Sequence, residues 1–373
     1  MEQPQIKGWC PTGWRPMASG DGWIMRLQLS AYTSTQLLHV CAVAEQCGSG
    51  VIELTNRGNV QLRGLPEHAI PAAQSALHKL GCLPPAEAPL PIILNPDWAP
   101  GDLTHQLAQT WQSRPSMPLS LPAKFSIVFD AGAQPILSDV RADIRVECSA
   151  SGTLLVRLDG QHLGARCTSV RAAIEHIEAL MTWFAAHRSE TVQRLRHIAA
   201  PPRWHQPDTP PAAVRPPLQP GSTRQGCVLG VPFGQMLASA LKDALSAGPA
   251  SSVRVTPWRS LLLNDWQQWP EFDAKPWIRS ANDPRSRIIA CPGAPHCSQA
   301  TVATRDLALA LAPWVNGTLH VSGCAKRCAS RSSTDIELIG RNGRYDLTQP
   351  NCQPAQPSTG LTAEDALTQL RRH

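Results

Sequence analysis

The sequence predicts an α+β protein built from two similar halves, and three observations support this architecture. A strand–helix–strand order near the N-terminus returns after residue 222. Each copy is followed by a larger segment in which strand and helix patterns are mixed. The proline-dense stretch 200–221 separates the two halves and has no apolar periodicity, which is typical of an extended linker. We therefore expect two small half-domains that pair into one pseudo-symmetric core, each followed by an α/β domain.

The first copy occupies residues 20–64. Thr33 and Gln36 have the spacing of a capping box, which predicts the start of a helix there, and Gly48 ends its apolar pattern. Short strands are expected on both sides of this helix and after the turn that follows. Their predicted ranges are Trp23–Leu29, Val51–Thr55 and Val60–Arg63.

The second copy repeats this order with weaker signals. Leu237, Leu241 and Ala244 have helical spacing, and Gly248 follows them. Strands are predicted over Cys227–Val231 and Val253–Thr256. The two copies also share a small motif, because Thr55-x-Arg57 has a counterpart in Thr256-x-x-Arg259.

The larger segments contain their own strands, helices and turns. Asn342-Gly343 is a strong signal for a tight hairpin turn between two strands. The predicted strands are Phe125–Phe129, a pair across Ile144–Leu158, Thr318–Ser322, Ile336–Ile339 and Arg344–Leu347, and the predicted helices are Ser169–Arg188, Thr304–Ala312 and Leu361–Leu370. The predicted domain ranges are 1–75, 76–199, 222–285 and 286–373, with the linker at 200–221.

Composition limits the classes of protein to consider. Hydrophobic residues make up 42% and charged residues 17%, the ordinary balance of a globular domain. The net charge of +6 includes no long basic run, so nucleic acid is not an expected partner. We expect no secretory signal and no membrane span, because no apolar run is long enough. Twelve cysteines are then no disulfide framework, and we expect a cytoplasmic protein.

Four of the cysteines form the pattern C-x5-C-x26-C-x3-C, and they are Cys291, Cys297, Cys324 and Cys328. The interval between the two pairs has room for one helix and one strand, so both pairs can lie in loops of a single folded unit. Four thiolates at one point suit an iron–sulfur cluster. A zinc site is the main alternative, although a gap of five residues is wide for a zinc-binding pair. Incidental buried thiols are the remaining alternative.

Three motifs together resemble the sulfite and nitrite reductase superfamily. The segment Thr55–Gly64 reads TNRGNVQLRG and is similar to the segment that holds the carboxylates of sirohaem in those enzymes. The segment Leu121–Phe125 resembles their L-P-x-K-F strand, and the cysteine pattern resembles their [4Fe-4S] motif. This resemblance implies that the half-domains are ferredoxin-like and that the larger domains are of the nitrite and sulfite reductase type.

Within that superfamily the chain resembles the precorrin-3B synthases. Three segments carry this closer similarity: Cys10–Gly22, Thr256–Arg259 and Ser322–Cys328. Two departures weaken a reductase interpretation. Ala325-Lys326 stands where the reductases have Pro-Asn, and Ser126 stands where sulfite reductases have a second basic residue.

The resemblance implies a particular chemistry. The family hydroxylates precorrin-3A at C20 and closes a γ-lactone, using dioxygen and two reducing equivalents, in aerobic cobalamin synthesis. A fully thiolate-ligated [4Fe-4S] cluster has no open iron position, so its implied role is electron transfer. The family is also associated with a mononuclear non-haem iron. His296, His320 and Asp335 lie near the cysteine motif, but form no evident ligand set in the sequence. The sequence identifies no catalytic residue.

Electrons are expected from an external NADH-linked reductase or ferredoxin, because the chain has no G-x-G-x-x-G fingerprint. Two alternatives stay open. One is a sirohaem-dependent sulfite or nitrite reductase, and the other is a non-catalytic tetrapyrrole-binding iron–sulfur protein. A tetrapyrrole fringed with carboxylates needs several fixed cations. The candidate substrate-binding residues are Arg15, Arg26, Arg57, Arg63, Lys124 and Arg259.

Overall fold

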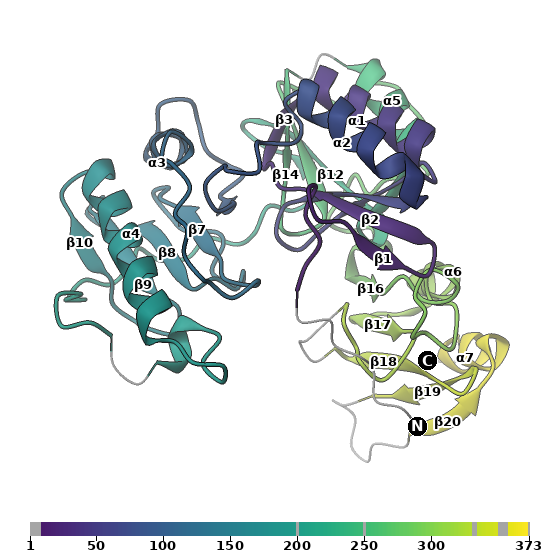
Figure 1. Cartoon of the computed structure of the whole chain (residues 1–373). Helices are drawn as coiled ribbons and strands as arrows, with labels where there is room; N and C mark the ends of the chain where they lie inside the picture. Colours follow the sequence, from purple (N-terminus) through teal and green to yellow (C-terminus); the bar gives the residue numbers. More distant parts are fainter. Residues whose placement is uncertain (1–8, 199–200, 249–250, 330–333, 350–356, 372–373) are drawn as a thin grey trace.

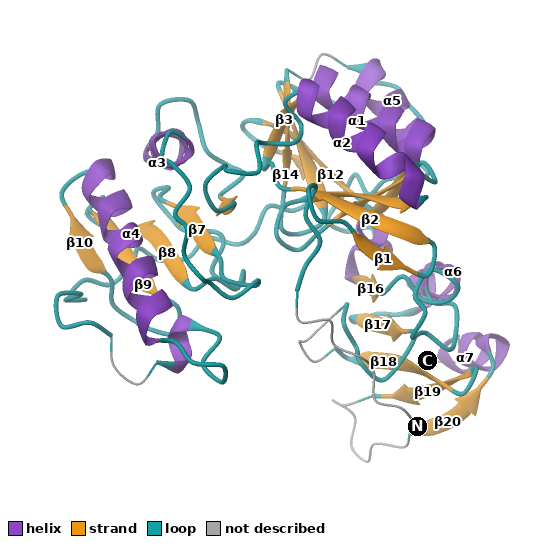
Figure 2. Ribbon diagram, in the orientation of Figure 1, coloured by secondary structure: helices purple, strands orange, loops and turns teal. Residues whose placement is uncertain are grey.

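The computed structural model describes residues 9–198, 201–248, 251–329, 334–349 and 357–371. Within these residues the strands form four sheets of five strands each. Two sheets share one hydrophobic core and form the centre of the molecule. The other two sheets belong to separate α/β layers, which Figures 1 and 2 show on either side of a gap between ribbons.

The first core sheet contains four strands of the N-terminal half and one strand of the other half. The helix α1 (Ser34–Cys47) begins at a capping box formed by Thr33 and Gln36, as predicted, and its C-cap is Gly48. A second helix, α2 (Ile70–Lys79), packs against α1. The strands of the sheet, in spatial order and all antiparallel, are β1 (Met17–Ser19), β2 (Gly22–Leu27), β5 (Val60–Leu65), β4 (Val51–Leu54) and β13 (Gln235–Leu237).

The second core sheet has the same plan with the halves exchanged. Its helix α5 (Ala238–Ala247) packs against α1, and the helices lie together over the strands in Figure 1. Its strands, again antiparallel, are β11 (Gly221–Ser222), β12 (Gly226–Gly230), β15 (Ser260–Asn264), β14 (Ser252–Val255) and β3 (Ala31–Thr33).

The exchange makes the core a single unit. The strand β3 directly precedes α1, and β13 directly precedes α5, so each half gives the strand before its helix to the sheet of the other half. Buried side chains of both halves then form one continuous cluster. The predicted pairing of two half-domains into a pseudo-symmetric core is therefore present, and strand exchange is the means.

Two turns related by this pseudo-symmetry have the same backbone bonds. The amide of Thr55 donates to the carbonyl of Asn59, and the amide of Thr256 donates to the carbonyl of Ser260, both at 2.9 Å. Both threonine hydroxyls also accept amide hydrogen bonds within their turns. When Thr55 is matched to Thr256, Arg259 is the equivalent of Gly58. Both residues have positive φ, 56° for Arg259 and 64° for Gly58. The positional counterpart of Arg57 is therefore Trp258, one residue away from the expected Arg259.

The first α/β layer carries two helices on one face of its sheet. The helices α3 (Leu103–Gln112) and α4 (Val170–His187) are capped by Asp102 and Ser169. On the other face, Val128 packs with the apolar side chains of residues 136–142. The strands in spatial order are β10 (Ala165–Cys167), β9 (Leu154–Leu158), β8 (Ile144–Cys148), β7 (Ile127–Asp130) and β6 (Ile92–Leu94), of which β6, β7 and β8 are parallel.

The second α/β layer repeats this arrangement and contains the four cysteines of interest. Its helices are α6 (Arg305–Leu311) and α7 (Ala363–Leu370). The hairpin predicted at Asn342-Gly343 is present, and both residues have positive φ. The strands in spatial order are β16 (Ile288–Ala290), β17 (Leu319–Ser322), β18 (Ile336–Arg341), β19 (Arg344–Thr348) and β20 (Ser358–Leu361), of which β16, β17 and β18 are parallel.

The proline-rich stretch is extended, as predicted, and it is bound along the first α/β layer. No helix of four or more residues and no strand lies between residues 201 and 220. Thr209 forms a bridge with Gly164, and the amides of Ala212 and Arg215 donate to Cys148 and Pro135. The domain boundaries drawn from the sequence stay a prediction.

One predicted strand begins later than expected. The sequence predicts a strand over Phe125–Phe129, and the L-P-x-K-F motif extends the strand expectation to Lys124. In the structure β7 begins at Ile127, and Lys124 lies in the turn before it. The amide of Phe125 closes this turn by donating to the carbonyl of Pro122. None of the helices among the described residues is long and apolar enough to cross a membrane.

Candidate functional site

A large cavity lies where both half-domains and both α/β layers meet. Its volume is about 940 Å³. Residues of both pseudo-symmetric turns line it, including Arg57 and Trp258. Eight lysine and arginine side chains line this cavity against one carboxylate, that of Asp139. The lining is therefore strongly cationic.

Five of the eight cations have no carboxylate within ion-pair distance among the described residues. They are Arg26, Arg57, Lys124, Arg141 and Arg259. The other three form ion pairs with carboxylates: Arg194 with Asp143, Arg196 with Asp159, and Arg285 with Asp283.

The five unpaired cations have neutral contacts or none. Arg26 donates twice to the Oε1 atom of Gln61, at 2.9 and 2.6 Å. Arg57 donates to the carbonyl of Lys124 at 2.9 Å, and Arg259 lies 3.5 Å from the carbonyl of Ala329. These bonds fix the guanidinium groups without neutralising their charge.

Burial adds to the electrostatic cost of this arrangement. It lowers the pKa of Arg26, Arg57 and Arg259, and like charges lower the pKa of two of them further. Arg194 and Arg26 act on the pKa of Arg57, whereas Arg305 acts on that of Arg259. A guanidinium stays protonated in proteins. The cavity is therefore a half-buried site with excess positive charge, which an anionic ligand would relieve.

The structure brings together four of the six predicted substrate-binding residues. Arg26, Arg57, Lys124 and Arg259 all line the cavity. Arg15 does not line it: its side chain is exposed and lies 4.3 Å from the ring of Trp9.

Arg63 is also outside the cavity lining, and its donors are committed to partners inside the protein. It is 3% exposed and forms ion pairs with Asp21 at 2.8 Å and Glu53 at 3.1 Å. The same guanidinium donates to the hydroxyl of Ser19 and to the carbonyl of His296, each at 3.1 Å. These contacts connect β5 to the loop between the first two cysteines, which is a structural role.

Sequence reasoning missed five cavity residues. Arg141 and Arg194 lie in loops, and Arg196 and Arg285 lie in short 3-10 helices. No motif marks any of the four, and the fold alone brings them to the cavity. Cys10 belongs to the opening segment Cys10–Gly22, but its position beside Arg26 and Arg57 follows only from the structure.

The four candidate metal-ligating cysteines lie in the loops that follow two adjacent parallel strands. Cys291 and Cys297 follow β16, and Cys324 and Cys328 follow β17. The carboxyl ends of parallel neighbours meet at one edge of the sheet, which brings the loops together. Cys328 also lines the cationic cavity.

The cysteines of this set act on one another electrostatically. A hydrogen bond with the Cys328 thiol lowers the pKa of Cys291, and the amides of Gly323 and Gly293 lower it as well. The Gly323 amide lies 3.1 Å from the Cys291 sulfur. The same contact raises the pKa of Cys328, together with the charges of Cys297 and Cys324.

This donor set fits an iron–sulfur cluster in its chemistry. Four cysteines and a sulfur-directed backbone amide are the groups that such a cluster uses. Among the described residues, no group of three or more His, Cys, Asp or Glu side chains is arranged to hold a single metal ion. The fit therefore rests on donor chemistry: four cysteines of two neighbouring loops and one backbone amide directed at a sulfur.

The three residues considered for a mononuclear iron do not form one site. His296 lies 3.5 Å from Asp21. His320 is fully buried, and neither ring nitrogen has a hydrogen-bond partner among the described residues. Asp335 accepts hydrogen bonds from the amide and hydroxyl of Thr318.

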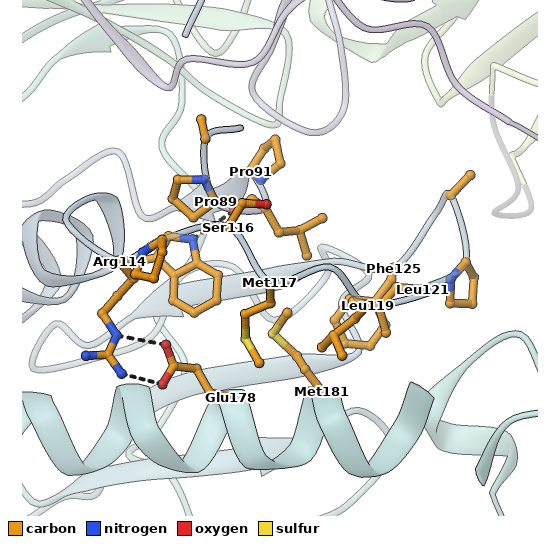
Figure 3. Close-up of a pocket in the computed structure, with 16 residues that line it drawn as sticks. Pro89, Pro91, Arg114, Ser116, Met117, Leu119, Leu121, Phe125, Glu178 and Met181 are labelled. Carbon is orange, nitrogen blue, oxygen red and sulfur yellow. Dashed lines mark hydrogen bonds and ion pairs between the residues drawn. The ribbon is translucent and has the colours of Figure 1, made fainter. Parts of the chain in front are cut away.

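A second, smaller pocket lies within the first α/β layer (Figure 3). It has a volume of about 290 Å³ and an apolar lining that includes Met117, Phe125 and Met181. Its two charged residues, Arg114 and Glu178, pair with each other at 2.6 Å. It offers no unpaired charge to an anion, so the larger cavity is the candidate site.

Comparisons with known proteins agree with the fold and the motifs. Residues 15–80 match the family model described as the nitrite/sulfite reductase ferredoxin-like half domain. A curated relative named precorrin-3B synthase, from Sinorhizobium sp, is 29% identical over 94% of this chain and 84% of its own length. The solved structure of the Mycobacterium tuberculosis NirA protein is similar with a TM-score of 0.65 and 15% identity, over 94% of this chain and 80% of that one. The comparisons thus confirm the resemblance to the superfamily and the closer resemblance within it. The chain is an enzyme that resembles precorrin-3B synthase and has the fold of the nitrite and sulfite reductase superfamily.

Proposed function

We propose that this chain converts precorrin-3A into precorrin-3B in aerobic cobalamin biosynthesis. In the proposed reaction, one oxygen atom of dioxygen enters the macrocycle at C20 and the other leaves as water. Two electrons and two protons balance that reduction, and a ring-A acetate closes the γ-lactone. The similarity to a named precorrin-3B synthase over most of the chain supports this proposal.

The observation that carries the proposal is the set of five cations without carboxylate partners in one cavity. Precorrin-3A is a flat macrocycle with a fringe of acetate and propionate groups. Shielded contacts between a guanidinium and a carboxylate contribute roughly 1.5–3 kcal/mol each. Three or four such contacts would dominate the affinity for this substrate.

The proposed roles of the cations follow from the elements that carry them. Arg57 and Arg259 lie on the two pseudo-symmetric turns, so they reach the ligand from different half-domains. Lys124 and Arg141 lie on loops of the first α/β layer and reach it from there. Carboxylates held from several elements would fix the orientation of the macrocycle, which is what selective attack at one carbon requires.

We propose that Cys291, Cys297, Cys324 and Cys328 hold a [4Fe-4S] cluster. When bound, such a cluster supplies electrons, and with four thiolate ligands it has no open position for oxygen. Cys328 lines the cavity, so the proposed cluster site borders the substrate site. The electron donor in this proposal is an external NADH-linked reductase or a ferredoxin. A mononuclear non-haem iron remains part of the family expectation, and the described residues give it no ligand set.

Isotope labelling tests this function. The purified chain is reconstituted anaerobically with iron and sulfide, then mixed with precorrin-3A, a reductant and ¹⁸O₂, and the product is analysed by mass spectrometry. The proposal expects one labelled oxygen atom in the product. A product without label would refute the hydroxylase, and a bound substrate without oxygen consumption would indicate a tetrapyrrole-binding protein without catalysis.

One observation favours a second candidate, the sirohaem-dependent reductase. Cys328 lines the cavity, as a cysteine that reaches the iron of a bound sirohaem must do. Against it, Ser126 is buried outside the cavity lining, so no second basic residue accompanies Lys124 on that segment. The visible spectrum separates the candidates, because stoichiometric sirohaem gives a strong Soret band and a cluster alone gives a broad shoulder.

A further inference from the structure

Arg305 is a buried arginine with spare hydrogen-bond donors beside the cysteine loops. It is the first residue of α6, and its side chain is 12% exposed. Its Nη2 atom binds Oε1 of Glu53 at 2.7 Å. Its Nε and Nη1 atoms are buried and have no hydrogen-bond partner among the described residues. Buried donors without a partner are costly and rare in folded proteins, so this arrangement calls for an explanation.

The surroundings of Arg305 place its charge between the cysteines and the cavity. Its positive charge lowers the pKa of Arg259, which lines the cavity. The preceding residue, Thr304, donates from its hydroxyl to the carbonyl of Cys291 at 2.6 Å. The start of α6 is therefore attached to the first cysteine of the set.

A continuous polar path also leads from Arg305 to the cavity. Glu53 is 7% exposed and accepts hydrogen bonds from both Arg305 and the side-chain amide of Gln61. Gln61 in turn accepts from Arg26, which lines the cavity. Glu53 is also paired with Arg63, so it only partly neutralises Arg305.

We propose that Arg305 is a positioning residue that raises the reduction potential of the cluster held by the four cysteines. This rests on the proposed function, which supplies the cluster. Reduction adds one negative charge to a cluster, and a buried cation at the start of the helix that is hydrogen-bonded to the Cys291 backbone stabilises the reduced state. Glu53 moderates the effect, because its carboxylate opposes the same field.

Two substitutions that remove charges of opposite sign test the proposal in the full-length chain. Arg305→Gln removes the positive charge, and Glu53→Gln removes the opposing negative charge. Arg305→Lys keeps the charge, and Arg341→Gln is the matched control, since Arg341 forms an exposed pair with Asp346 in the same layer. Iron and acid-labile sulfide are measured first, and the midpoint potential then follows from a redox titration monitored by electron paramagnetic resonance.

The expected result is a pair of opposite shifts. Arg305→Gln should disfavour reduction at least tenfold, a shift of about 59 mV to more negative potential. Glu53→Gln should shift the potential to more positive values, while Arg305→Lys and Arg341→Gln stay near the wild type. Loss of structure alone gives no reason for opposite signs.

Two outcomes would overturn this inference alone. Both glutamine variants could have potentials within error of the wild type, or both could shift in the same direction. Either result would remove Arg305 from this role while leaving the cluster in place. If Arg305→Gln fails to retain iron, the sign of the Glu53→Gln shift decides. A wild-type chain that retains no iron and sulfide would instead refute the proposed cluster, and this inference with it.

Discussion

Arg57 and Arg63 lie in one short segment, and their surroundings differ completely. Arg57 reaches the cavity and has a backbone carbonyl as its partner. Arg63 is buried between Asp21 and Glu53, with further bonds to Ser19 and His296. The first arginine has its positive charge available to a ligand, and the second has its charge neutralised within the protein. The two residues therefore call for different experiments.

Replacing Arg57 by alanine should weaken the binding of a carboxylated tetrapyrrole at least tenfold, which corresponds to about 1.4 kcal/mol. The reason is the loss of one guanidinium from the set of unpaired cations that would bind the carboxylates. Fluorescence or absorbance titration of the anaerobic protein measures the effect. Arg166→Ala is the control, because Arg166 forms an exposed pair with Asp208. Equal affinity of the Arg57 variant and the wild type would exclude this residue from the site.

Replacing Arg63 by alanine should destabilise the fold by about 3–5 kcal/mol, because the buried Glu53 and the half-buried Asp21 lose a shared partner. Urea unfolding measures the change. The matched control is Arg114→Ala, whose pair with Glu178 is partly exposed and should contribute less than about 1 kcal/mol. A variant with unchanged stability but weaker tetrapyrrole binding would instead support the substrate-binding role predicted from the sequence.

At the scale of the element, the loop after β16 depends on a glycine. Gly293 has φ of +68°, and a Cβ atom there would lie 2.6 Å from the hydroxyl oxygen of Thr304. That hydroxyl binds the carbonyl of Cys291. The conformation of the cysteine loop is therefore set by contact with the start of α6.

The change Gly293→Ala should reduce the iron and sulfide retained after reconstitution, because the added methyl group displaces Thr304 and the Cys291 backbone. Gly343→Ala is a close control. Gly343 has φ of +77° in the same layer, but a Cβ atom there meets open space. Backbone strain is similar in both variants, so equal retention of iron in the two would argue against the role of the Thr304 contact.

The end of β7 contains a buried carboxyl group that predicts a pH dependence. Burial and the charge of Glu147 raise the pKa of Asp130 from 3.8 to about 6, although the amides of Ile136 and Leu137 oppose the shift. The native state therefore binds this proton more readily than the unfolded state. By linkage, the contribution of Asp130 to stability falls as pH rises from about 4 to about 6, by on the order of 1 kcal/mol per pH unit.

Urea unfolding of wild type and Asp130→Asn across that pH range isolates this contribution. Asparagine keeps an acceptor for the two amides but cannot titrate. The stability of the wild type relative to the variant should decrease with rising pH. A constant difference across the range would show that the carboxyl group titrates at its ordinary value.

Elements with a strong local signal could be predicted from the sequence, and short strands could not. The capping box of α1 and the hairpin at Asn342-Gly343 depend on neighbouring residues, and both are present. The exchanged strands β3 and β13 have three residues each, too few for a period to be visible. Lys124 was expected in a strand because its motif resembles one, but a turn closed within residues 122–125 holds it.

At the scale of the whole molecule, the exchange of β3 and β13 joins the two halves. Each core sheet contains a strand from the other half, and α1 packs against α5 across the same boundary. The sequence repeat predicted two paired half-domains, but the exchange depends on contacts distant in sequence. The cavity could be predicted in part for the same reason: a motif marked Arg57, whereas only tertiary contacts assemble Arg141 and Arg285 beside it.

A chain cut in its linker should therefore remain associated. A protease site inserted after Val214, which is 54% exposed, would allow cleavage without disturbing the core. The two fragments should elute together in size-exclusion chromatography under native conditions and separate in denaturant. Separation under native conditions would contradict the exchanged arrangement.

The most direct test of the account concerns the recognition of carboxylates by the cavity. Precorrin-3A and its methyl-esterified form are titrated against the same anaerobic protein, because the ester keeps the macrocycle and removes the negative charges. The account predicts that the free acid binds at least a hundredfold more tightly than the ester, a difference of about 2.8 kcal/mol. Equal affinities would show that the unpaired cations do not recognise this substrate.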